Sequence, residues 1–402
     1  MTCQTTTSDR MAEASTDDGD RLPLAALLVM ALMGFLLIAT ETMPAGLLPQ
    51  IAVGLSVSEG VAGQFVSAFA LGTVIAAIPA VALTRGMRRK PVFIVGILGI
   101  LAANVVTALS SEIALSLAAR FVGGAFAGLV WGMTAGYARR ITAPRYTGRA
   151  LAIASIGVPL GLAVGTPFGS WLGATSDWRW SFGTLAVLTL ITAVLAALLI
   201  PDAPGQAATT QIALVRVLHL PGVAVILAVI VAWMLAHNIV YTYISAYLSS
   251  GGLDLSVDVA LVTFGVAALL GIGVTGAVID HTLRPLVLTS IALFIAAGAL
   301  FIVGHHSVVA VLMAIVLWGL AFGGAAAQLQ TAISIASGDN ADVANSMLGV
   351  AFNLAIFAAG VVGAVVIGNF DGIALPIVMV VLALTALTLA FLGRRTAFPM
   401  RP

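Results

Sequence analysis

The chain is short of charged residues. Asp, Glu, Lys and Arg make up 8% of its 402 residues, whereas about a quarter of an average soluble domain is charged. Hydrophobic residues reach 61%, and apolar runs long enough to cross ~30 Å of hydrocarbon as helices recur from end to end. These runs are continuous and do not alternate with polar residues as the strands of a membrane β-barrel would. The composition therefore excludes a soluble protein and predicts membrane-spanning helices.

Cysteine, net charge and enzyme motifs are also scarce. The single cysteine, Cys3, allows neither a disulfide framework nor a thiolate metal site within the chain, and we expect no metal and no cofactor. A formal net charge of +1 leaves no basic stripe for a nucleic-acid partner. No H-E-x-x-H and no G-x-S-x-G occurs. We therefore do not expect an enzyme, and a membrane hydrolase or sensor is the alternative from another class.

Charged residues, prolines and glycine clusters divide the chain into twelve apolar spans. Six begin near residues 22, 61, 91, 113, 150 and 182, and six more near 223, 257, 286, 308, 343 and 373. We predict an all-α membrane protein with a tail at 1–21, a six-helix bundle at 22–200, a linker at 201–219, a second six-helix bundle at 220–393 and a tail at 394–402. The acidic first tail is unlike a cleavable signal peptide, so the first helix should stay attached.

Basic residues cluster on one side of the predicted bundle. Fifteen of the 17 Lys and Arg follow the even-numbered helices or lie in the tails and linker, whereas Arg179 lies in an opposite loop and Arg120 inside a span. Loops rich in Lys and Arg stay in the cytoplasm. We therefore predict a multi-pass protein of the cytoplasmic (inner) membrane with both termini in the cytoplasm.

The two halves repeat a pattern after their second helices. Thr84 and Arg88 are spaced like Asp280 and Arg284, and a proline follows each pair. Parallel repeats of this kind enclose a site near the midplane that opens alternately to either side.

Three motifs carry a resemblance to a known family. The first span contains ATETMPAGLLPQIA between Ala39 and Ala52, and the fourth carries Arg120 ahead of several glycines. The fifth is rich in glycine and proline, at Gly157, Pro159, Gly161, Gly165, Pro167, Gly169 and Gly173. With these motifs the chain resembles the major facilitator superfamily, in particular its twelve-helix drug:proton antiporter branch near the chloramphenicol-resistance and arabinose-efflux-like permeases. The resemblance implies two six-helix bundles that exchange access by rocking.

The resemblance also implies conformational roles. The glycine-proline motif of exporters maps onto Gly161, Gly165, Pro167 and Gly169, and ordinary small-residue packing is the alternative for any one of them. The cytoplasmic latch of the family maps onto Thr84, Arg88, Asp280 and Arg284, although the family expects an aspartate where Thr84 stands. The basic run near Arg88 is equally well explained as a topology signal alone.

Glu41 and Arg120 are the ionisable residues that lie well inside spans. If Leu48 ends the first helix and Ile113 begins the fourth, both lie seven residues, or about 10 Å, from the outer surface. A carboxylate that can approach or leave a guanidinium changes its proton affinity. We therefore predict proton coupling through this pair, and a permanent ion pair that fastens the two helices is the alternative.

Polar residues in the other spans are candidates for substrate contact. The seventh span carries His237, Asn238, Tyr241 and Ser245, and the four-residue spacing of three of them places them on one helical face. Trp131, Gln328 and Asn353 are further substrate candidates, with Gln64, Asn104, Trp318, Gln330 and Asn345 as additional cavity candidates. Hydrogen bonding between helices is the alternative for each.

Together these features predict proton-coupled efflux of a small, mostly apolar organic molecule or drug. Few charges are available inside the membrane for a strongly ionic substrate. A sugar or nucleoside exporter, or a proton symporter of the same fold, is the near alternative. The expected partners are the substrate, protons and membrane lipid, and the expected state is a monomer.

Overall fold

The computed structural model describes residues 22–84, 86–205 and 214–398, and within these ranges the chain is helical without strands. Twelve helical segments of the described chain are long and apolar enough to cross a membrane. The predicted all-α membrane fold is thus confirmed. Cys3 and the rest of residues 1–21 lie outside the described residues.

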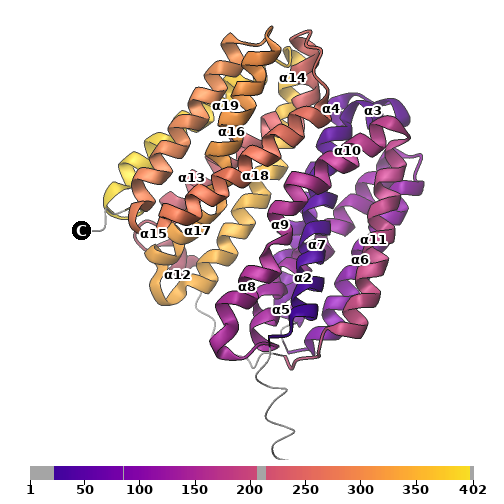
Figure 1. The fold of residues 1–402 in the computed structure, drawn as a ribbon, viewed down its shortest axis with the longest axis vertical. Coiled ribbons are helices and arrows are strands. Elements are labelled where there is room, and N and C mark those ends of the chain that lie inside the picture. The colour runs from indigo at the N-terminus through magenta and orange to yellow at the C-terminus, as the bar shows by residue number, and fades with distance from the viewer. Residues whose placement is uncertain (1–21, 85, 206–213, 399–402) are drawn as a thin grey trace, which may run out of the picture.

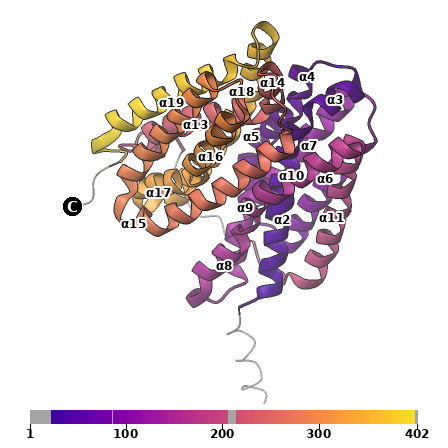
Figure 2. The same cartoon turned by 45° about the horizontal axis from the view of Figure 1, so that its top comes forward.

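The first six spans pack together as one group of helices, drawn indigo to magenta in Figures 1 and 2. In chain order they are built from α2 (Leu24–Thr42), η1 (Met43–Leu47) and α3 (Leu48–Leu55); α4 (Glu59–Ala62) and α5 (Gln64–Thr84); α6 (Arg89–Leu109); α7 (Ile113–Arg140); η2 (Pro144–Tyr146), α8 (Thr147–Ser155), α9 (Gly157–Leu160), η3 (Gly161–Gly165) and α10 (Thr166–Thr175); and α11 (Trp178–Leu199). We call this group the first bundle.

The second six spans form a second group, drawn in orange and yellow. It consists of α12 (Leu214–Leu218), α13 (Val223–Thr242), α14 (Ile244–Ser250), α15 (Val257–Val303), α16 (Val308–Gly323), α17 (Ala325–Ser337), η4 (Gly338–Asn340), α18 (Ala341–Asn369), α19 (Ala374–Leu392) and η5 (Gly393–Arg395). α15 holds two spans, Val257–Ile279 and Thr282–Val303. We call this group the second bundle.

Proline residues explain the main interruptions of the membrane-spanning helices. α15 changes direction at Thr282, which has φ −132° and ψ 28°, three residues before a proline that cannot complete the helical hydrogen-bond ladder. In the first span, Pro44 is the second residue of the 3₁₀ turn η1, which begins at Met43. The helix then resumes and ends at Leu55, so the expected outer end at Leu48 was wrong.

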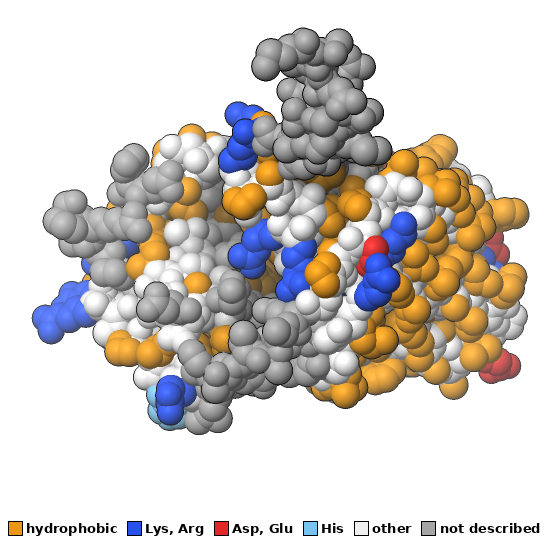
Figure 3. Space-filling model, turned by 90° about the horizontal axis from the view of Figure 1, so that it is seen from below, with side chains coloured by type: hydrophobic (Ala, Val, Ile, Leu, Met, Phe, Trp, Pro, Cys, Tyr) orange, Lys and Arg blue, Asp and Glu red, His pale blue; other side chains and the backbone are white. Residues whose placement is uncertain are grey.

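The two ends of the molecule differ in charge. We name the end that carries α3, α4 and α14 the α4 end, and the opposite end, which carries α8 and α12, the α8 end (Figure 1). Arg139 and Arg140 close α7 and Arg216 lies in α12. Figure 3 looks at the α8 end and shows Lys and Arg side chains gathered on it beside an apolar flank. This distribution matches the two-sided arrangement of basic residues in the sequence.

The bundles are joined by polar contacts at the α4 end. Gln64 donates to the carbonyl of Gly360 at 3.1 Å, and Ser67 donates to the carbonyl of Phe357 at 3.3 Å. Ser245 donates to a carboxylate oxygen of Glu59 at 3.2 Å. The hydroxyl of Tyr243 also donates to the carbonyl of Gly60 at 3.5 Å. α5 and α18 therefore form a seam that closes one side of the molecule.

Candidate functional site

Glu41 lies in the last turn of α2 and is buried, with 6% of its surface exposed. Arg120 lies in α7 with 1% exposed. The two side chains interact electrostatically, yet no direct ion pair joins them in the part of the chain that the structure describes. The structure thus brings together the two predicted residues without fastening them to each other.

Arg120 is held by other groups. Its Nε donates to the backbone carbonyl of Phe65 at 3.0 Å, and its guanidinium lies over the rings of Phe69 and Phe182, 4.5 and 5.6 Å from their centroids. One terminal nitrogen of Arg120 is buried without a hydrogen-bond partner among the described residues. Cation–π contacts stabilise a guanidinium in apolar surroundings, and the free nitrogen leaves a donor for a further anion or acceptor.

The neighbourhood of Glu41 is polar on one side. Thr40 precedes it and accepts a hydrogen bond from Asn104 of α6 at 3.4 Å. Thr42 follows it, donates to the carbonyl of Ile38 at 2.7 Å and lies 2.6 Å from the hydroxyl of Thr166 in α10. The residues on either side of Glu41 are therefore hydrogen-bonded to α2 itself, to α6 and to α10, and these bonds position the helix end that carries Glu41.

The glycines of the fifth span form a stripe that packs against the first span. A Cβ at Gly157 would overlap the carbonyl of Ala31, and one at Gly161 would lie 2.8 Å from the carbonyl of Phe35. The same four-residue step continues at three more positions: Gly165 faces Ala39, Gly169 faces Met43 and Gly173 faces Leu47. Small residues in register let two helices approach at backbone distance. The stripe therefore positions the helix that carries Glu41.

The predicted residues Gly161, Gly165, Pro167 and Gly169 belong to this contact. Gly161–Gly165 form a π-helical turn rather than regular α-helix, and Pro167 begins α10 behind it. A π-helical turn widens the helix locally and often occurs at functional sites.

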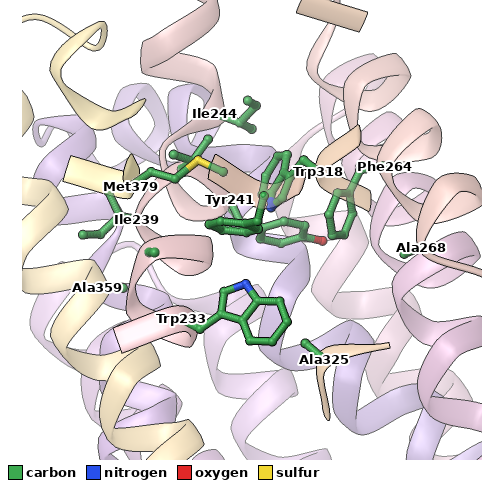
Figure 4. Close-up of a cluster of buried hydrophobic side chains, with 14 of the residues drawn as sticks. Trp233, Ile239, Tyr241, Ile244, Phe264, Ala268, Trp318, Ala325, Ala359 and Met379 are labelled. Atoms are coloured by element: carbon green, nitrogen blue, oxygen red, sulfur yellow. The ribbon is translucent and has the colours of Figure 1, made fainter. Parts of the chain in front are cut away.

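Two of the second-bundle candidates lie in a cluster of rings. His237 stacks on Phe322 with a centroid distance of 3.6 Å and an interplanar angle of 7°, and it contacts Tyr241 at 5.2 Å. Trp318 donates from Nε1 to Nδ1 of His237 at 3.0 Å. We call His237 and the four rings that contact it, Tyr241, Phe264, Trp318 and Phe322, the aromatic cluster. Figure 4 shows Tyr241, Phe264 and Trp318 packed together with Trp233 nearby.

The helix that carries His237 and Tyr241 is interrupted before Ser245. The helix ends at Thr242, and Tyr243 has φ −111° and ψ 30° before α14 begins. Tyr243 therefore interrupts the helix that was predicted to carry His237, Tyr241 and Ser245 on one face, and Ser245 bonds Glu59 in the first bundle.

The other substrate candidates mostly bond within their own bundle. Asn238 donates to the carbonyl of Met234 in its own helix, and Asn353 does the same to Gly349. Gln328 donates to Thr275 at 3.2 Å and Ser290 at 3.0 Å, which ties α17 to α15. Trp131 packs in the first bundle near Gly34 of α2. The structure does not gather these residues with His237.

The predicted latch residues of the first bundle hold the start of the linker. Arg88 forms an ion pair with Asp202, and Lys90 donates to the same carboxylate from its backbone N–H at 3.1 Å. Thr84 bonds its own helix at the carbonyl of Ala80. Arg284 lies in α15, two residues after the kink, and the Asp280 side chain lies outside the described residues.

More contacts fasten the same segment, residues 201–205. Tyr137 donates to the carbonyl of Pro201 at 2.9 Å, and Arg140 donates to that of Pro204 at 2.7 Å. Desolvation by itself raises the pKa of Asp202, but the backbone N–H groups of Lys90 and Ala203 and the Arg88 guanidinium outweigh it and lower that pKa. Asp202 therefore stays charged at neutral pH.

Sequence reasoning missed Phe264, Phe322, Glu59 and Asp202. The two phenylalanines sit in apolar spans where nothing distinguishes them from core residues. Glu59 lies at the start of α4 and Asp202 in the segment after α11, where a carboxylate signals little. Only their partners in space, Ser245 and Arg88, give them a place in the site.

Comparison with known proteins agrees with this architecture. The family model described as Major Facilitator Superfamily matches residues 30–360. Curated relatives from Salmonella paratyphi B and Salmonella typhi, both described as "Purine ribonucleoside efflux pump NepI", are 27% identical over 390 residues, which cover 95% of this chain and 98% of each relative.

A solved structure shares the fold. The crystal structure of the human organic anion transporter MFSD10 (TETRAN) superposes with a TM-score of 0.65 at 18% identity, covering 92% of this chain and 97% of the other. Because the family model spans most of the chain and the twelve-helix fold agrees with it, this protein belongs to the major facilitator superfamily, as a multi-pass membrane transporter and not an enzyme.

Proposed function

We propose that this transporter exports a small, uncharged, mostly apolar organic molecule in exchange for protons by alternating access. The observation that carries the proposal is the pair Glu41 and Arg120: within the described part of the chain they interact without a direct ion pair, and one nitrogen of Arg120 has no hydrogen-bond partner there. A carboxylate buried in hydrocarbon is costly unless it is protonated or paired. Glu41 can therefore alternate between a protonated form and a carboxylate that faces Arg120.

We infer the orientation of the transporter in the membrane from the charge of its two ends. Basic loops stay cytoplasmic, which places the α8 end in the cytoplasm together with both termini, in the inner membrane. The seam at the α4 end, formed by Gln64, Ser67 and Ser245 with their partners, is then the outer gate in its closed state. Release of substrate requires this seam to separate while the α8 end closes.

We expect the substrate to be surrounded by apolar side chains rather than by charged ones. The exposed faces of α11 and α19 carry large apolar residues, among them Val187, Leu198, Val381 and Leu392, which fit direct contact with membrane lipid by a monomer. Inside, the aromatic cluster offers ring faces and few charged groups.

Purine ribonucleosides are the second candidate substrate class. Two observations favour them: relatives that align with 95% of the chain are described as purine ribonucleoside efflux pumps, and His237, Tyr241 and Phe322 offer stacked rings at the site. Flat heterocycles stack on aromatic side chains. A sugar exporter or a proton symporter of the same fold remains the alternative.

Proteoliposomes with an imposed pH gradient test the proposal. We expect uphill movement of a substrate, with labelled adenosine and a panel of apolar drugs as probes, together with counter-movement of protons reported by a pH-sensitive dye. Transport that runs at the same rate without a proton gradient would contradict proton coupling. Drug transport without adenosine transport would reject the purine candidate alone, and product formation without flux would reject transport itself.

A cellular screen supplies the substrate range. The protein is expressed in an efflux-deficient bacterium, and drug susceptibility and nucleoside accumulation are compared with those of cells expressing Glu41→Gln.

A further inference from the structure

The bond between Trp318 and His237 determines which imidazole nitrogen carries the proton. The indole N–H of Trp318 lies 3.0 Å from Nδ1 of His237. An indole nitrogen only donates hydrogen bonds, so the nitrogen that it contacts must be an unprotonated acceptor. The imidazole is then neutral and carries its proton on Nε2.

Surrounding rings hold the imidazole in one plane. Phe322 covers one face at 3.6 Å with nearly parallel planes, while Phe264 lies 5.4 Å and Tyr241 5.2 Å from its centroid. Phe264, Trp318 and Phe322 carry no charge, and Tyr241 is the titratable ring among these contacts. The ring contacts therefore offer no counter-charge for an imidazolium.

The cluster reaches the interface between the bundles. Tyr241, one helical turn from His237, faces the side chains of Thr42 and Thr166 in the first bundle. Thr42 is the residue next to Glu41. No described residue is hydrogen-bonded to Nε2 of His237, which leaves that N–H as an unused donor within the aromatic cluster.

We propose that Trp318 is a positioning residue that holds His237 as the neutral Nε2–H tautomer at the substrate site. The site then presents one hydrogen-bond donor next to aromatic faces. It selects flat, uncharged molecules that carry an acceptor atom, such as a ring nitrogen of a purine. This assignment of substrate class rests on the proposed export function, whereas the tautomer of His237 does not.

Nitrogen NMR of the intact protein tests the tautomer directly. The full chain is labelled with ring-¹⁵N histidine in lipid nanodiscs, and the His237 signals among those of the five histidines are assigned by their loss in His237→Gln. We expect the neutral Nε2–H pattern throughout about pH 5 to 8, the range in which an ordinary histidine changes charge. In Trp318→Phe, which keeps a ring but loses the donor, we expect the Nδ1–H tautomer or the imidazolium to appear.

Trp233 provides the matched control. It is a buried tryptophan of the same bundle whose Nε1 has no hydrogen-bond partner among the described residues, so Trp233→Phe should leave the His237 spectrum unchanged. An Nδ1–H or imidazolium signal in the unmodified protein would overturn the proposal. A Trp318→Phe spectrum identical to that of the unmodified protein would do the same.

Binding of labelled adenosine at constant pH tests the substrate class. Trp318→Phe should weaken binding about 2- to 10-fold, the effect of one net hydrogen bond, while Trp233→Phe should not change it. Equal binding by both variants would reject the positioning role at the substrate site. If the unmodified protein binds no adenosine while the NMR result holds, the purine class fails and the tautomer assignment stands.

Discussion

At the residue scale, Glu41 and Arg120 stand out because both are ionisable side chains buried inside membrane spans. Both lie inside spans with at most 6% of their surface exposed. Arg120 is stabilised by the Phe65 carbonyl and by two phenylalanine rings, so it does not depend on Glu41 for its position. This separates the stability of Arg120 from the protonation of Glu41, which a permanent ion pair would not allow.

Glu41→Gln should separate binding from coupled transport. The amide keeps the size and hydrogen bonding of a protonated glutamate but cannot release a proton. We expect substrate binding within about twofold of the unmodified protein and uphill export reduced at least about tenfold, in keeping with a coupling role for an intramembrane carboxylate. Binding and pH-driven flux are measured on the same proteoliposome preparation.

Glu112→Gln is the control for this change. Glu112 is an exposed carboxylate that precedes α7 in a loop, and its replacement should affect neither measurement. If Glu41→Gln sustains uphill, pH-driven export at the original rate, Glu41 is a structural residue and the proton moves elsewhere. His237 is a poor substitute while Trp318 keeps it neutral.

At the scale of elements, the glycine stripe sets the distance between the first and fifth spans. Five glycines at four-residue intervals face five residues of α2 and η1 at the same interval. The stripe passes through the π-helical turn η3, where the fifth span departs from regular helix. A shift of the fifth span would therefore move the backbone that carries Glu41.

Gly165→Leu should abolish transport while the protein still inserts into the membrane. A Cβ at this position already lies 3.0 Å from the Ala39 Cβ and from the Phe35 ring, so a leucine would force the helices apart. Hydrophobicity does not fall, and insertion should not suffer. We expect at least about a tenfold loss of flux, with membrane abundance measured by immunoblot.

Gly183→Leu in α11 is the matched control. A Cβ there meets nothing within 4 Å, so the same substitution should leave flux unchanged. A well-expressed Gly165→Leu protein with normal transport would show that close approach at this position is dispensable.

Residues 201–205, at the start of the linker, are a second segment that side chains of the first bundle hold in place. Arg88, a residue expected to act at the gate between bundles, instead pairs with Asp202 at the end of its own bundle. Tyr137 and Arg140 hold the same segment. The basic loop after α5 thus anchors the connection between the bundles in this conformation.

Asp202→Asn should loosen this segment. We expect faster cleavage of the linker in limited proteolysis, with Asp254→Asn, an exposed aspartate near the α4 end, as the unchanged control. Because its pKa is lowered, Asp202 keeps its charge between about pH 5 and 8, and the protection should be constant over this range. It should be lost only as pH falls through that lowered pKa; protection that declines already near neutral pH would contradict the assignment.

At the scale of the whole molecule, a row of polar contacts joins the two bundles at the α4 end. The seam of α5 with α18 closes the α4 end, and the basic residues lie at the α8 end. Orientation in the membrane therefore decides which compartment the closed seam faces.

Labelling of Cys3 should establish the orientation. A membrane-impermeant thiol reagent should modify Cys3 only in inside-out vesicles if, as we propose, the basic loops keep the α8 end and both termini in the cytoplasm. Cys3 is the one cysteine of the chain, so the unmodified protein serves directly. Cys3→Ser with Ser176→Cys, in the loop before α11, should show the opposite pattern, and labelling of Cys3 in intact cells would reverse the orientation.

The sequence by itself determined the class of fold and the number of spans. Continuous apolar runs, prolines and the scarcity of charge are local properties, and they predicted the positions of twelve helices to within a few residues. They also singled out Glu41 and Arg120, because the cost of a charge in hydrocarbon does not depend on its neighbours.

Only the tertiary structure decided which residues meet. Arg88 pairs with Asp202, Ser245 with Glu59, and Trp318 with His237, across separations of up to 186 residues along the chain. Such pairs depend on the rotation and tilt of packed helices and on interruptions such as Tyr243, which breaks the helix between His237 and Ser245. Side-chain periodicity describes one regular helix at a time, so it contains no information on these contacts.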